Sequence, residues 1–111
     1  MAFDERLADR IRDVIQARPD VVEKKMFGGV GWMLQGNMAV GVMSTGGLIV
    51  RIDPDEAEAV LTEPGVGTFG REGSRPMKGM VVVSPDVLSD DSSLAGWIDR
   101  GADRASSLPP K

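Results

Sequence analysis

The chain has 111 residues, and its 13 Lys and Arg residues against 17 Asp and Glu residues give a net charge of −4. This length suits one hydrophobic core, so we expect a single domain over residues 1–111 with frayed ends at 1–3 and 109–111. There is no cysteine and no histidine, which excludes disulfides, thiolate metal sites and Ser-His or Cys-His catalysis. The acidic balance also disfavours non-specific binding to DNA or membranes.

We expect no targeting signal in the N-terminal segment. It is charged from Asp4 onward, and no apolar run in the chain approaches the length of a signal-peptide core or a membrane span. We therefore expect a cytoplasmic protein, in keeping with the absence of cysteine. We also expect no bound cofactor, no metal and no contact with a membrane.

The first element in chain order is an amphipathic helix, because apolar residues recur at helical spacing and charges fill the other face. Asp4 has the side chain of an N-cap. The helix should stop near Ala17, because Pro19 holds Arg18 in an extended conformation. The apolar stripe consists of Leu7, Ile11, Val14 and Ile15.

An antiparallel meander is expected next, because the hydrophobic period changes to two and short glycine-rich turns separate the apolar runs. Gly36 and Asn37 form one such turn. Gly31 and Gly41, inside strands, indicate bulges or the close approach of another backbone, such as a packed helix. The predicted strands cover residues 21–27, 30–35, 38–43 and 48–52; in the last of them Leu48, Val50 and Ile52 share one face and Ile49 and Arg51 the other.

A short middle helix follows, with Asp53 as N-cap and Pro54 in its first position. An extended or irregular segment then leads to "GMVVVS", residues 79–84, whose continuous apolar character predicts a strand in the interior of the sheet. Helical structure restarts after Pro85. The final helix presents one apolar stripe of Leu94, Trp97, Ile98, Ala102, Ala105 and Leu108.

The sum is an α+β domain, in which an antiparallel sheet, a meander plus a later strand, is combined with N-terminal and C-terminal helices and a short middle helix. "GVGTFG", residues 65–70, matches the dinucleotide-binding fingerprint, but it follows a helix and opens none, so we interpret it as a chance match. The acids at Asp53–Glu56 and Asp90–Asp91 stand at helix starts, where the helix dipole stabilises them without a catalytic role.

The stretch "FGREGSRPMKGM", residues 69–80, is the remaining candidate site. Arg71, Arg75 and Lys78 offer two guanidinium forks and a point charge that suit a phosphate or a carboxylate. The alternative is a solvated connection in which an arginine pairs with Glu72 or with an acid of the preceding helix. The acidity of the chain as a whole favours this alternative.

Three further basic residues lie on the predicted strands. Lys24 and Lys25 belong to the first strand and Arg51 to the fourth. They enlarge the candidate anion-binding or partner-binding patch only if their side chains lie on the same face of the sheet as residues 71–78.

Three features occur in order: "MFGGVGWMLQGNMAVGV", then "LIVRID" before a short helix, then "GSRPMKGMVVV" before a helix containing Trp97. Together they resemble the TfoX N-terminal domain family, named after regulators of natural competence that are also called Sxy. The resemblance spans about residues 7–108 and implies a small α+β fold similar to that of YjbR-like proteins. It supplies no catalytic residue and no cofactor. Competence regulators of this type carry a second, helical domain, so the resemblance implies the fold more directly than the competence role.

The resemblance and the missing catalytic chemistry favour a non-catalytic, regulatory domain that binds another protein, in a process related to transcription or competence. The alternative function is a nucleic-acid or small-anion binding module that uses residues 71–78. An exposed sheet edge or a methionine patch would make a homodimer reasonable. An enzyme is the least favoured class, because no nucleophile, base and oxyanion donor come together in the sequence.

Overall fold

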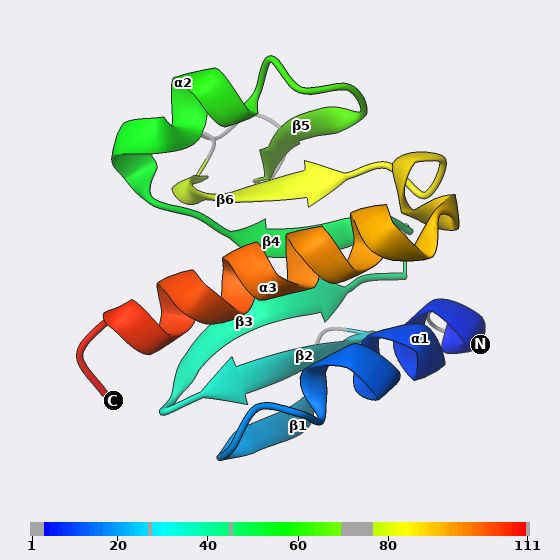
Figure 1. Ribbon diagram of the computed structural model, residues 1–111, viewed down its shortest axis with the longest axis vertical. Coiled ribbons are helices and arrows are strands. Elements are labelled where there is room, and N and C mark those ends of the chain that lie inside the picture. The colour runs from blue at the N-terminus through cyan, green and yellow to red at the C-terminus, as the bar shows by residue number, and fades with distance from the viewer. Residues whose placement is uncertain (1–3, 27, 45, 70–76, 111) are drawn as a thin grey trace.

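The computed structural model describes residues 4–26, 28–44, 46–69 and 77–110. Six antiparallel strands form one sheet in the order β1-β2-β3-β4-β6-β5. Two long helices, α1 and α3, lie on the same side of this sheet, and α2 lies beyond its β5–β6 end (Figure 1). The elements are α1 Glu5–Ile15, β1 Val21–Met26, β2 Gly29–Leu34, β3 Asn37–Val42, β4 Leu48–Arg51, η1 Pro54–Glu56, α2 Ala57–Val60, β5 Val66–Phe69, β6 Met77–Val83, η2 Val87–Ser89 and α3 Asp91–Ser107.

The strand order confirms the predicted α+β fold. Strands β1 to β4 form the meander, and β6 pairs with β4 on one side and with β5 on the other. The interior position predicted for "GMVVVS" is therefore correct. Strand β5 occupies Val66–Phe69, within the segment that the sequence indicated only as extended or irregular. Its extended backbone confirms that the "GVGTFG" match does not open a helix.

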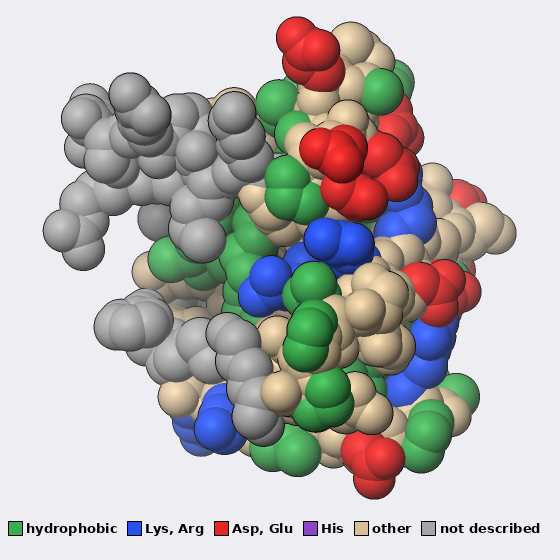
Figure 2. Space-filling view, turned by 90° about the vertical axis from the view of Figure 1, so that its left-hand side faces the viewer, with side chains coloured by type: hydrophobic (Ala, Val, Ile, Leu, Met, Phe, Trp, Pro, Cys, Tyr) green, Lys and Arg blue, Asp and Glu red, His purple; other side chains and the backbone are tan. Residues whose placement is uncertain are grey.

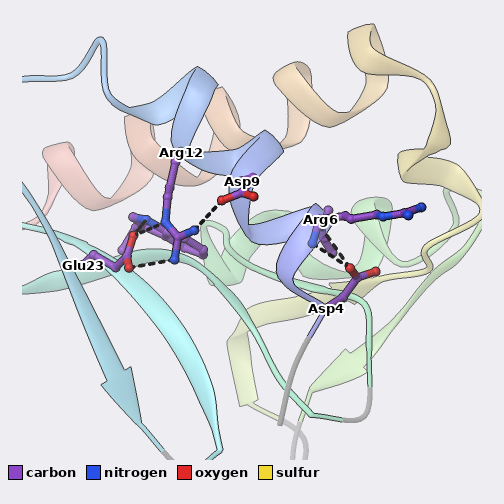
Figure 3. A network of polar contacts seen from close by, with 7 residues as sticks. Asp4, Arg6, Asp9, Arg12 and Glu23 are labelled. Carbon is purple, nitrogen blue, oxygen red and sulfur yellow. Dashed lines mark hydrogen bonds and ion pairs between the residues drawn. The ribbon is translucent and has the colours of Figure 1, made fainter. Parts of the chain in front are cut away.

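Capping side chains fix where the helices begin. The Asp4 carboxylate accepts hydrogen bonds from the backbone N–H groups of Arg6 and Leu7, at 3.0 and 3.2 Å (Figure 3). Asp53 likewise accepts from the backbone N–H of Asp55 at 2.9 Å. Both predicted N-caps are confirmed.

The turn between β2 and β3 differs by one residue from the prediction. Its two residues are Gln35 and Gly36, with φ values of 54° and 85°. Positive φ at both positions is typical of the two-residue hairpin turns that match the twist of a sheet. Asn37 is therefore the first residue of β3, where its buried side chain donates to the Pro109 carbonyl at 3.0 Å.

The hydrophobic core lies between the sheet and the two long helices. Val40, Val50 and Val81 are paired across β3, β4 and β6, and each is at most 1% exposed. Helix α3 crosses β3 and β4 above this row. Its close approach requires Gly101, because a Cβ at this position would stand 2.5 Å from the Ala39 carbonyl oxygen.

The helix contact suggested for Gly31 and Gly41 is therefore made elsewhere. These two glycines are paired with each other in β2 and β3, and a bulge follows them between Trp32 and Met33. A Cβ at Gly41 would meet the Met38 sulfur and the Val30 carbonyl oxygen, both at 3.3 Å. The bulge thus lies next to the glycine pair and not at it, and the helix packs on the opposite side of the sheet.

Candidate functional site

The structure describes only part of the basic stretch. Arg71 and Arg75 lie outside the described residues, and Lys78 belongs to β6 with a side chain that is not among those described. Lys24 and Lys25 lie on β1, at the edge opposite to β5. Four strand spacings separate β1 from β6, which amounts to about 19 Å. The structure thus does not bring the two lysines next to the strand of Lys78, and an anion site at 71–78 stays a prediction.

The two lysines point to opposite sides of the sheet, because successive side chains alternate along a strand. Lys25 is paired with Val30, which is 2% exposed within the core, so it lies on the helix side. Lys24 is paired with Gly31 and lies on the other side, which we call the helix-free face. Both lysines are exposed.

None of the described helices covers the helix-free face of the six strands (Figure 1), although Ile49 at its centre is only 5% exposed. One row of paired residues runs across the middle of this face and contains three glycines, Gly31, Gly41 and Gly67. Side chains from the neighbouring rows can cover the backbone at these glycines. Met33 and Met38 are paired with each other next to this row and are half-buried. The central row consists of Lys24, Gly31, Gly41, Ile49, Val82 and Gly67.

The strands place basic but no acidic side chains on the helix-free face. Glu23 is the only acidic residue within the six strands, and its carboxylate turns to the helix side to bind Arg12 of α1. The strands therefore place no carboxylate on the helix-free face, although the chain as a whole is acidic. Val22, beside Met33, is 51% exposed and is the large hydrophobic residue that stands out among those described. Among the described side chains, Val22, Met33 and Met38 thus form an apolar area beside Lys24 at the β1 edge of this face.

A second candidate site is a cleft of about 360 Å³, where the C-terminal half of α3 passes the end of β4 and the start of the middle helix. Figure 2 looks onto this end of the molecule and shows basic side chains at its centre, with acidic side chains above and beside them. The cleft is lined by Arg51, Arg100 and Arg104, by Asp53, Glu56 and Asp103, and by Ile52, Val60 and Ser107.

Arg51 is held in this cleft by one strong contact. Its Nε donates to the Met38 carbonyl oxygen at 2.6 Å. Burial lowers the pKa of Arg51, and the positive charge of Arg104 lowers it further. Arg51 remains protonated, because arginine stays charged in proteins. Arg51 and Arg104 are thus two cations that line one cleft and repel each other.

Arg104 is incompletely satisfied. Its Nε is buried and has no hydrogen-bond partner among the described residues. Its Nη1 lies 3.8 Å from Asp53 Oδ2, which is too long for a hydrogen bond. Arg100 differs, because it forms a two-point pair with Glu63 at 3.0 and 3.2 Å and stacks over the Trp97 ring at 4.1 Å. Arg51 and Arg104 are therefore the two cations of the cleft that form no hydrogen bond with a carboxylate among the described residues.

The acidic residues of the cleft are partly occupied elsewhere. Asp103 accepts a hydrogen bond from Arg18 at 2.8 Å, and Asp53 caps the middle helix. Glu56 is exposed at the rim. The cleft thus contains two incompletely satisfied guanidinium groups and the exposed carboxylate of Glu56. Within the described part of the chain, no group of three or more Asp and Glu residues has the arrangement of a metal site.

Sequence reasoning identified Arg51 but missed Arg100 and Arg104. A signal was present: the two arginines are four residues apart on one helix, where like charges repel each other. Such a pair indicates that acids or a ligand compensate for the repulsion. The neighbouring Asp99 and Asp103 are acids that can compensate for it, so the spacing alone does not predict a ligand site.

The described helices are too short or too polar to span a bilayer.

Comparison with known proteins places the chain in one family. The model of the TfoX N-terminal domain matches residues 13–105, a segment that runs from α1 through all six strands into α3. No curated protein and no solved structure shows a significant match. The match confirms the resemblance seen in the sequence, and the chain belongs to the TfoX N-terminal domain family.

Proposed function

We propose that this domain is a non-catalytic, cytoplasmic regulatory module that binds another protein through its helix-free face. Family membership supports a regulatory role, in a process related to transcription or competence. The absence of histidine and cysteine supports a role without catalysis. A partner protein is favoured over a nucleic acid because the net charge of −4 opposes a polyanion.

The helix-free face is the observation that carries this proposal. It combines an exposed Val22 with half-buried Met33 and Met38 near its β1 edge, whereas Ile49 at its centre is buried. Methionine is unbranched and polarizable, so a surface rich in it adapts to the side chains of a partner. Exposed apolar surface next to polar residues is typical of protein interaction sites.

The charges of the face indicate the chemistry of the partner. Lys24 is exposed on this face, and the strands contribute no carboxylate to it. An apolar segment flanked by acidic residues matches this surface, because complementary charges guide association and discriminate against wrong partners. Such a partner would avoid the remaining, acidic surface of the domain.

Lys24 and Lys25 provide a matched test. The two residues are neighbours on β1, are both exposed and point to opposite faces. In affinity purification from cells, Lys24→Glu should weaken recovery of the partner, whereas Lys25→Glu, with the same charge change, should leave it intact. Urea unfolding of both variants checks that each is folded.

Recovery of the same proteins by both variants would contradict docking on the helix-free face. A wild-type domain that recovers no specific protein would contradict the function itself. A second copy of the chain is also a protein partner, and size-exclusion chromatography of the two variants identifies it if Lys24→Glu alone shifts the elution.

A further inference from the structure

We propose that the cleft between α3 and the end of β4 binds a small molecule that carries one oxyanion, a phosphate or a carboxylate, together with an amino or hydroxyl group. This site is separate from the proposed protein-docking face. We infer its ligand from the hydrogen-bonding groups of its residues that have no partner among the described residues.

The oxyanion is assigned from Arg51 and Arg104. Arg51 uses its Nε on the Met38 carbonyl oxygen, and none of the described residues accepts from its two terminal nitrogens. Arg104 has only the 3.8 Å approach to Asp53, and its buried Nε has no partner among the residues described. Planar guanidinium groups bind phosphate and carboxylate oxygens through charge-assisted, two-point hydrogen bonds. An oxyanion between them would also remove their mutual repulsion.

The second group of the ligand is assigned from the acidic rim. Glu56 and Asp53 lie in the same cleft as the two arginines. A polyanion would meet these carboxylates and be repelled, so a nucleic-acid backbone does not suit the cleft. A ligand that also offers a hydrogen-bond donor satisfies both sides. The volume of about 360 Å³ lies at the lower end of the range for small-molecule sites, about 300–1,000 Å³.

Arginine Nε–Hε signals in NMR spectra report on this site directly and need no variant. The probes are inorganic phosphate, acetate and phosphoethanolamine, each titrated at constant ionic strength so that general screening stays fixed. We expect a saturable shift of the Arg104 signal with phosphate or acetate, and the stronger of the two identifies the oxyanion. No saturable shift with either probe would overturn the proposal.

A matched pair of variants separates the cleft from general charge. Arg104→Gln should weaken binding of the better probe by about tenfold or more, because it removes hydrogen bonds between charged groups. Arg6→Gln makes the same charge change at an exposed residue at the start of α1 and should leave the affinity unchanged. Equal affinities of the two variants, both with wild-type-like spectra, would overturn the assignment to the cleft.

Phosphoethanolamine tests the second group. Its ammonium group should make it bind more tightly than inorganic phosphate, and Glu56→Gln should remove this preference. Equal affinity for the two probes would overturn the assignment of an amino or hydroxyl group, and a preference that persists in Glu56→Gln would overturn the role of Glu56.

Discussion

Arg12 and Glu23 join the first helix to the edge strand by a two-point ion pair. Arg12 Nε and Nη2 lie 2.7 and 2.9 Å from the two carboxylate oxygens of Glu23, and Arg12 also binds Asp9 at 2.7 Å (Figure 3). The same carboxylate accepts from the indole Nε1–H of Trp32 at 2.9 Å. One carboxylate thus connects α1, β1 and β2.

Glu23→Gln should reduce the dependence of stability on acid pH. The hydrogen bond from Arg12 is the main cause that holds the pKa of Glu23 below its usual range. A lowered pKa in the folded state contributes stability above the pKa of the unfolded chain, about 4.3, and this contribution is lost as the pH falls through the folded value. Because the Arg12–Glu23 pair is half-exposed, we expect Glu23→Gln to lower the unfolding free energy by about 1 kcal/mol at pH 7. In urea unfolding, the difference in unfolding free energy between the wild type and Glu23→Gln should shrink toward pH 2. A difference that stays constant with pH would contradict the account.

Glu23→Ala should cost more than Glu23→Gln. Glutamine keeps a side-chain oxygen that can accept from Trp32, whereas alanine leaves the indole N–H without its acceptor. Trp32 is 2% exposed, so an unsatisfied N–H there costs about 1–3 kcal/mol. Equal unfolding free energies for the two variants at pH 7 would show that Trp32 does not need this hydrogen bond.

Two glycines of α3 should respond to alanine with opposite signs. Gly96 is exposed, and a Cβ there would meet no atom within 4 Å, so Gly96→Ala should stabilise the helix by about 0.5–1 kcal/mol. Gly101→Ala should destabilise by about 1–3 kcal/mol, because its Cβ would stand 2.5 Å from the Ala39 carbonyl oxygen. Thermal unfolding of the two variants measures both, and a stabilising Gly101→Ala would mean that α3 is not held this close to β3.

Trp97→Ala should lower the unfolding free energy by about 3–5 kcal/mol, because it empties a large buried site. The ring is 6% exposed beneath the guanidinium group of Arg100. Arg100→Ala, which removes the stacked cation and leaves the ring, should cost much less, on the order of 1 kcal/mol. Similar losses in urea unfolding for both variants would contradict the placement of the ring in the core.

Local signals in the sequence predicted most of the fold, because helix caps and strand alternation depend on neighbouring residues. Asp4 and Asp53 cap helices as expected, and the stripe on the last helix is buried from Leu94 to Ala105. Strand β5 was missed because its residues, Val66–Phe69, are half-buried or exposed at a sheet edge and show little alternation.

The candidate sites were less predictable, because they depend on which elements pack together. Alternation shows that Lys24 and Lys25 face opposite ways, but it does not show which face the helices cover. The cleft joins Arg51 and Arg104, which are far apart in the sequence and meet only through the crossing of α3 over β4. No local pattern encodes that crossing.

Cross-linking from adjacent positions of β1 tests the docking face most directly. Because the chain has no cysteine, Lys24→Cys and Lys25→Cys each introduce a unique thiol for a photoactivated cross-linker, on opposite faces of the same strand. The account predicts that the purified, labelled domain cross-links a specific protein in a cell lysate from position 24 and not from position 25. The same protein cross-linked equally from both positions, or from position 25 alone, would contradict binding through the helix-free face.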